Sequence, residues 1–149
     1  MSGRADPAPQ EGNSMADVRF IDLSGTIKAD DRGLSFFPWP DRLTAPEEVL
    51  KTFHLVSVRP GQTRGHHLHP GHAEWLYLFH GAGLFTWEAA PGQVREQVIK
   101  GDRTLIHIPP GIAHALTNPG PEILYLLAWR EAAGPGPMDP ETVRHPLKV

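Results

Sequence analysis

The segment TRGHHLHPGHAEW, which begins at Thr63, is rich in side chains that bind metal ions. In a β-strand alternate side chains point to the same face, so we expect His67 and His69 to converge. A Pro-Gly pair is expected to turn the chain after them, and Glu74 then opens the next strand, placed to add a carboxylate oxygen. A fourth donor, His114, follows the Pro-Pro-Gly turn of the segment IPPGIAHALTN.

Three imidazoles and one carboxylate suit a divalent transition metal such as Zn, Fe, Ni, Mn or Cu, and they leave coordination positions open for water or substrate. The chain has no cysteine, which excludes a thiolate site. A single histidine in a strand is more often a surface or hydrogen-bonded residue than a ligand. Four donors at these spacings arise by chance far less often. The sequence therefore predicts one metal ion bound by His67, His69, Glu74 and His114.

The segments that carry these donors are predicted to be short β-strands. Apolar or alternating segments are cut by Gly and Pro turns about every ten residues, which is typical of an all-β sandwich or barrel. The predicted strands are residues 18–21, 34–37, 52–58, 64–69, 74–79, 83–88, 93–99, 103–108, 113–117 and 122–129. One helical turn is predicted over Ala45–Lys51, where Pro46 stands at a helix-start position and two glutamates follow it.

The chain of 149 residues is long enough for one domain with its own core. Residues 1–14 lack a periodic apolar pattern, so we predict that they are disordered and that residues 15–149 form the domain. Its Pro-rich end, over residues 131–149, is expected to run as an extended arm across the barrel.

Charge and hydropathy exclude several classes of function. The formal net charge of −3 gives no electrostatic footprint for nucleic acid. No apolar run approaches the roughly 20 residues that span a bilayer, so no membrane association is expected. The N-terminus is polar and lacks the apolar centre of a signal peptide, which predicts a cytoplasmic protein.

The donors and their neighbouring glycines and prolines resemble the two sequence motifs of the cupin superfamily. The matching positions are Gly61-x5-His67-x-His69-x4-Glu74-x6-Gly81 and Pro109-x-Gly111-x2-His114-x3-Asn118. Seven residues separate Gly101 from Pro109, more than is usual in the family. The resemblance covers about residues 52–130. It implies an all-β, single-domain jelly roll (an antiparallel double-stranded β-helix) that binds a metal and pairs as a homodimer.

A narrower resemblance is carried by the runs TRGHHLHPGHAEWLYLFHG, IPPGIAHALTNPG, LLAWRE and MDPETVRHPL. They are similar to the metal-binding cupin domain of capsular-polysaccharide sugar-nucleotide epimerase/reductase enzymes and to stand-alone sugar epimerase or isomerase cupins. This resemblance implies isomerisation or epimerisation beside a carbonyl group. The substrate would be a keto-sugar nucleotide or a related small metabolite.

Such a reaction needs a base that moves a proton from the carbon next to the carbonyl, while a metal acts on the carbonyl oxygen as a Lewis acid. The candidate bases are His72, His80 and His107. We favour His107 because it stands two residues before Pro109, close to the second motif. Glu74 is either a metal ligand or a further candidate base.

Three further residues are candidates for contact with substrate. Arg64 could clamp a phosphate or carboxylate at the mouth of the barrel, although strand alternation makes it face away from His67. Tyr77 and Trp129 are the aromatic residues most suited to line the pocket, because each carries a polar group.

Two other classes of function remain open on the same residues. A site of three histidines and one glutamate also serves iron-dependent dioxygenases and metal-dependent decarboxylases or lyases of small organic acids. The third class is a non-enzymatic cupin that binds a small molecule. Metal identity and oxygen uptake would separate the two enzymatic classes.

Overall fold

The structure is a computed structural model that describes residues 16–39, 46–101 and 103–148. The predicted disorder of residues 1–14 lies outside these ranges. The elements in chain order are β1 (Arg19–Asp22), a 3-10 turn (Ser24–Thr26), β2 (Lys28–Asp30), β3 (Gly33–Ser35), α1 (Pro46–Leu50), β4 (His54–Val58), β5 (Thr63–Leu68), β6 (His72–His80), β7 (Ala82–Ala90), β8 (Gln93–Lys100), β9 (Thr104–Ile108), β10 (His114–Thr117), β11 (Leu124–Ala132) and β12 (Val143–Arg144).

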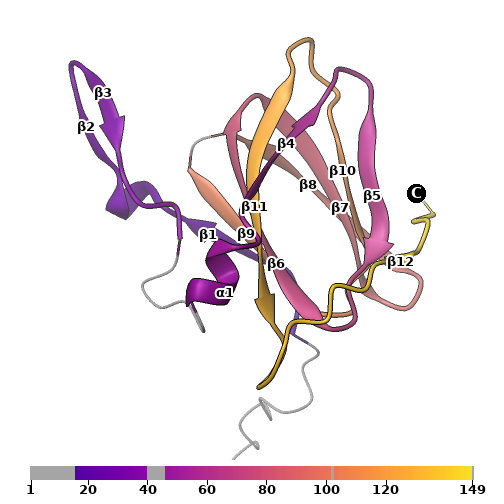
Figure 1. Cartoon of the computed structure of the whole chain (residues 1–149). Helices are drawn as coiled ribbons and strands as arrows, with labels where there is room; N and C mark the ends of the chain where they lie inside the picture. Colours follow the sequence, from indigo (N-terminus) through magenta and orange to yellow (C-terminus); the bar gives the residue numbers. More distant parts are fainter. Residues whose placement is uncertain (1–15, 40–45, 102, 149) are drawn as a thin grey trace, which may run out of the picture.

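The strands form two five-stranded antiparallel sheets that enclose the core. Their orders are β1-β9-β6-β11-β4 and β12-β5-β10-β7-β8. Figure 1 shows the two sheets wrapped against each other, with the β2–β3 hairpin projecting away from them. The predicted all-β jelly roll is confirmed. No helix among the described residues is long and apolar enough to cross a membrane.

Strand alternation builds the core between the sheets. Even-numbered residues of β6 and β11, such as Leu76, Leu78 and Leu126, meet Phe85 and Leu116 from the opposite sheet. A jelly roll buries one face of each strand in this way. The same strands also carry polar groups on that inner face near one end, which is where the candidate site forms.

A second apolar cluster covers the outer face of the first sheet. It contains Trp75, Tyr77 and Trp129, which alternate with the inward residues of β6 and β11. Val49 of α1 is buried in the same cluster. The predicted helical turn over Ala45–Lys51 therefore exists, as the shorter α1, and it packs against the outside of the barrel.

The C-terminal segment lies along the histidine-rich strand β5. Val143 and Arg144 of β12 pair with Leu68 and His67. Backbone hydrogen bonds extend this contact on both sides, from Ala133 N to Gly71 O and from His145 N to His66 O. The end of the chain thus holds the strand that carries the candidate ligands.

Candidate metal centre

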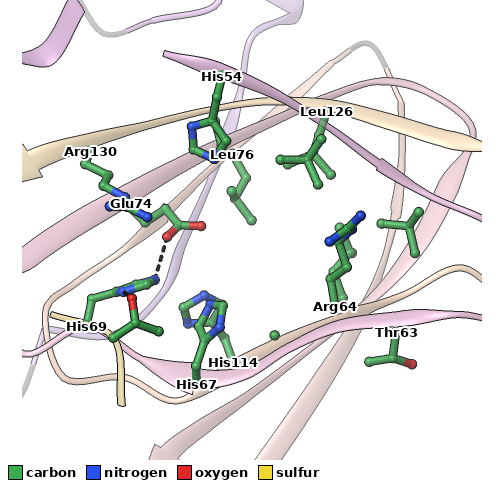
Figure 2. A pocket seen from close by; sticks show the side chains of 16 residues that line it. His54, Thr63, Arg64, His67, His69, Glu74, Leu76, His114, Leu126 and Arg130 are labelled. Atoms are coloured by element: carbon green, nitrogen blue, oxygen red, sulfur yellow. Dashed lines mark hydrogen bonds and ion pairs between the residues drawn. The ribbon is translucent and has the colours of Figure 1, made fainter. Parts of the chain in front are cut away.

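The four predicted ligands meet at one point on the inner face of the barrel. One nitrogen or oxygen from each of His67, His69, Glu74 and His114 lies within 4.8 Å of the others. They come from β5, the turn after it, β6 and β10. Figure 2 shows them at one side of an open pocket of about 410 Å³.

A β-bulge in β5 sets the direction of the ligands. The β5–β10 register passes from His114↔His67 to Ala115↔Gly65, which leaves His66 as an extra residue. His66 has a left-handed φ of 56° and Gly65 a φ of 109°. An added Cβ at Gly65 would lie 2.7 Å from the carbonyl oxygen of His114, so the two strands approach there as only glycine permits.

The bulge corrects the expectation that Arg64 faces away from His67. An extra residue between them shifts the alternation by one position, so both side chains line the same pocket. Arg64 is exposed, and its Nε donates a hydrogen bond to the carbonyl oxygen of Ser57 at 2.7 Å.

Two ligand rings are held by their Nδ1 atoms. His114 Nδ1 donates to the carbonyl oxygen of Ile112 at 2.9 Å, and His69 Nδ1 lies 3.1 Å from the hydroxyl of Thr142. With Nδ1 protonated, Nε2 of each ring carries the lone pair that binds a metal. Both Nε2 atoms are buried, and neither has a hydrogen-bond partner among the described residues.

His69 and Glu74 also place two potential ligand atoms next to each other without a hydrogen bond between them. Nε2 of His69 lies 2.7 Å from Oε2 of Glu74, close enough for an ion pair but without the geometry of a hydrogen bond. Two electron-pair donors that face each other in this way suit a shared cation. The donor set therefore fits a divalent metal ion.

Electrostatics keep His67, His114 and Glu74 in their metal-binding forms. Burial lowers the pKa of His67 to about 4, helped by His114 and His69, and burial also lowers the pKa of His114. Burial opposes ionisation of Glu74, but His69 and the other histidines outweigh it and bring its pKa to about 2. Near neutral pH His67 and His114 are therefore neutral imidazoles and Glu74 is a carboxylate, the forms that ligate metals.

The histidines proposed as bases lie elsewhere. His72 is fully buried, stacks on His69 at a ring distance of 4.3 Å and binds the carbonyl oxygen of Asp139 through Nδ1. His107 packs against Trp75 on the outer side of the first sheet. The exposed His80 lies 3.5 Å from a glutamate at the surface. None of the three is among the described residues that line the pocket, so these predictions are corrected.

Tyr77 and Trp129 also do not contact the pocket. Both belong to the outer cluster, because alternation turns Glu74 and Leu76 inward and their odd-numbered neighbours outward. The prediction that they contact a substrate in this pocket is therefore corrected too.

Among the described pocket residues that the sequence reasoning missed are His54, Arg130 and Thr142. His54 and Arg130 line the pocket from β4 and β11, and Thr142 reaches it from the C-terminal segment. The first two could have been found, because His54 continues the inward face of Val56 and Val58. Arg130 stands one position from Trp129, on the other face of the same strand.

A family model described as "Cupin domain" matches residues 54–130 of the chain. No curated protein sequence matches the chain. The capsular polysaccharide assembling protein CapF from Staphylococcus aureus is similar in structure, with a TM-score of 0.56 and 23% identity over 81% of this chain. That match spans only 34% of CapF, about a third of its length.

Two further solved structures are similar over more of their own length. A mutant of the 3,4-ketoisomerase QdtA from Thermoanaerobacterium thermosaccharolyticum, in complex with TDP-4-keto-6-deoxyglucose, has a TM-score of 0.67 and 17% identity, covering 87% of this chain and 88% of QdtA. The dTDP-6-deoxy-D-glucose-3,5-epimerase RmlC from Legionella pneumophila has a TM-score of 0.61 and 15% identity, covering 77% and 66%. At these identities the likeness shows a shared fold.

Proposed function

The chain belongs to the cupin family, and on that premise we propose that it is a metal-dependent isomerase or epimerase that acts beside a carbonyl group. The substrate would be a keto-sugar nucleotide or a related small metabolite. One observation carries the proposal: the donor atoms of His67, His69, Glu74 and His114 converge beside an open pocket. A divalent metal held by these donors could polarise the carbonyl group of a substrate bound in the pocket.

These four residues would hold the metal, and the pocket would place the substrate against it. A bound divalent metal supplies Lewis-acid polarisation of a carbonyl, which makes the neighbouring C–H bond more acidic. The pocket walls include the apolar side chains of Val56, Leu76 and Leu126, which would shield part of the substrate from water.

His54 is the pocket residue best suited to move the proton. Its Nδ1 donates to the carbonyl oxygen of Thr52 at 2.8 Å, so Nε2 of the neutral ring carries a free lone pair. Figure 2 shows His54 above Leu76, on the same side of the pocket as Glu74. Because Glu74 lies against His69 as a ligand, His54 is the better candidate base.

Arg64 would hold the phosphate part of a sugar nucleotide. Figure 2 shows it at the opposite side of the pocket from Glu74 and His69. Its Nε is fixed on Ser57, and the terminal nitrogens of the guanidinium can meet phosphate oxygens. The structures of QdtA and RmlC named above contain a TDP sugar and a dTDP sugar, which supports the choice of substrate class.

The test is proton exchange on TDP-4-keto-6-deoxyglucose in D2O, followed by NMR with protein loaded with Zn, Mn, Ni or Fe(II). We expect deuterium at a carbon next to the carbonyl and an isomeric product, both lost after chelation. His54→Gln should lower the rate by about 10²–10⁴ while the metal content is unchanged. No exchange on this or other keto-sugar nucleotides with any of the metals would count against the proposal.

The donor set itself favours a second candidate, an iron-dependent dioxygenase or a decarboxylase of a small organic acid. It contains three histidines and one carboxylate, one histidine more than the facial triad of many non-haem iron enzymes, and such donors also hold iron or manganese. Oxygen uptake that requires Fe(II) and an organic acid would establish this reading. Activity with Zn in the absence of oxygen uptake would favour the isomerase.

We also propose that the protein is a cytoplasmic homodimer. An apolar patch of Leu55, Phe79 and Tyr125 is exposed on the outer face of the first sheet. A second copy of the chain could cover this patch, which would be costly to leave in water.

A further inference from the structure

Arg130 is a cation on the inner face of β11 that forms no ion pair with another described residue. Leu126 and Ala128 share this face, and Arg130 pairs in register with Glu74 of β6. Its Nε is buried and has no hydrogen-bond partner among the described residues. None of the ion pairs formed by those residues includes it.

The cost of this arrangement points to a ligand. A buried donor of a charged group that lacks a partner destabilises the fold, and a hydrogen-bonded anion removes the cost. Glu74 does not supply that anion, because its carboxylate turns to His69. Figure 2 shows Arg130 directly beside Glu74, with its guanidinium toward the pocket.

The charge of the whole pocket points the same way. Among the described residues that line it are two arginines, Arg64 and Arg130, and a single carboxylate, Glu74. The pocket therefore has an excess of positive charge even before a metal binds. The two arginines lie on opposite sides of it, so they would contact different parts of one ligand.

We propose that Arg130 binds an anionic oxygen group, carboxylate or phosphate, at the end of the substrate that lies against the metal ligands. In a sugar nucleotide, whose diphosphate would meet Arg64, this end is the sugar, so Arg130 would favour a sugar that carries an acidic group over a neutral one. In a smaller substrate, Arg130 would bind the carboxylate or phosphate beside the reacting carbonyl. The inference rests on the proposed function, because it names the substrate class of the same pocket.

Oxalate, inorganic phosphate and imidazole serve as probes, titrated calorimetrically into Zn-loaded protein and into metal-free protein. Oxalate tests a carboxylate source and phosphate a phosphate source. Imidazole is a neutral metal ligand that reports on the metal centre alone. The variants are Arg130→Gln, Arg130→Lys and the matched control Arg64→Gln, which removes the same charge from the other side of the pocket.

We expect Arg130→Gln to weaken binding of oxalate or phosphate by at least about 10-fold, because a charge-assisted, two-pronged contact is lost. Arg130→Lys should recover part of the affinity, since it keeps the charge but not the planar fork. The anion whose affinity decreases more shows whether Arg130 recognises a carboxylate or a phosphate. Imidazole binding to the Zn-loaded protein should be the same in all variants, and Arg64→Gln should change oxalate binding much less.

The inference is overturned if Arg130→Gln binds both anions as the parent does. It is also overturned if Arg64→Gln weakens oxalate binding as much as Arg130→Gln does, which would show that only the overall positive charge of the pocket matters. It is also overturned if the parent binds neither anion in either form. These outcomes differ from failure of the proposed function, which would appear as absent isomerase turnover or absent metal in the parent protein. The metal-free titration tests Arg130 even in that case.

Discussion

Thr142 contacts a candidate ligand from a part of the chain far away in sequence. Its hydroxyl lies 3.1 Å from Nδ1 of His69 and can accept that proton, which leaves Nε2 free for a metal. The second-motif ligand His114 receives the same orientation from its own neighbour, the carbonyl oxygen of Ile112. One ligand is therefore held by a local backbone contact and the other by the C-terminal segment.

Thr142→Val should weaken metal binding by about 10–100-fold, the usual effect of removing a partner of a metal-ligating histidine. Valine has nearly the same shape, so packing is kept while the hydrogen bond is lost. Competition with a chromophoric chelator measures the affinity. Thr142→Ser retains the hydroxyl and is the matched control. Equal affinities for the valine and serine variants would show that the hydroxyl does not orient His69.

His107 lies outside the candidate site, and its titration should affect stability. Burial, with a contribution from Arg19, lowers its pKa to about 4 from an ordinary 6.5. Between these two values the unfolded chain binds a proton that the folded chain does not. The free energy of unfolding therefore decreases as the pH falls from 6.5 to 4. Above pH 6.5 the protonation of His107 makes no contribution to this free energy.

Urea unfolding of metal-free protein at several pH values measures this effect. The loss of stability below pH 6.5 should be shallower for His107→Gln than for the parent. His67 has the same window and remains in both proteins, so some slope will persist. Comparison above pH 6.5 gives the baseline cost of the substitution. Parallel curves for the two proteins would rule out the assigned role of His107.

At the scale of elements, much of the fold could be predicted because Gly and Pro mark the turns. The predicted strand 93–99 is β8 (Gln93–Lys100), and 103–108 contains β9. The β2 strand and the pairing of β12 were missed, since strands of two or three residues have no visible period. The four predicted ligands do converge: local strand and turn geometry sets the spacing of His67, His69 and Glu74, and the pairing of β10 with β5 places His114 opposite His67.

The predictions that failed depend on facts that a linear pattern does not show. A bulge changes which residues share a face, and only the inter-strand register of His66 reveals it. The inner face of β6 could have been inferred from the sequence. If Glu74 points inward as a ligand, strand alternation turns Tyr77, three residues later, outward. The base candidates were chosen by closeness to the motifs in sequence, whereas His54 reaches the pocket from a different strand.

The bulge in β5 provides a prediction at this scale. Gly65→Ala introduces a Cβ 2.7 Å from the carbonyl oxygen of His114 and 2.8 Å from Cα of Ala115, at a positive φ. We expect a loss of about 3 kcal/mol, combining backbone strain with overpacking. Metal affinity should fall too, because the backbone of His114 must move. Urea unfolding and chelator competition measure the two effects.

Gly92→Ala is the matched control for this substitution. Gly92 also has a positive φ, of 76°, but nothing lies within 4 Å of an added Cβ. Only the conformational cost of about 1 kcal/mol should appear, with unchanged metal affinity. If both substitutions cost the same, close approach of β5 and β10 would not be the reason for glycine at position 65.

At the scale of the whole molecule, one side of the barrel is incompletely covered. All six residues of the β2 and β3 strands are exposed, and the hairpin projects from the barrel (Figure 1). An isolated two-stranded hairpin is marginally stable in water. On the outer face of the first sheet, Leu55 is 72% exposed and Tyr125 39%. Both features suit a second copy of the chain as their cover.

The homodimer is testable by light scattering coupled to size exclusion. The parent should elute with twice the mass of one chain, and Leu55→Glu should give a monomer, because a carboxylate would be buried without a partner. Val98→Glu is the control, since Val98 is 62% exposed on β8 of the other sheet and should remain dimeric. A monomeric parent would contradict the homodimer. A dimer that survives Leu55→Glu would place the interface on another face, and the exposed apolar patch would then need another partner.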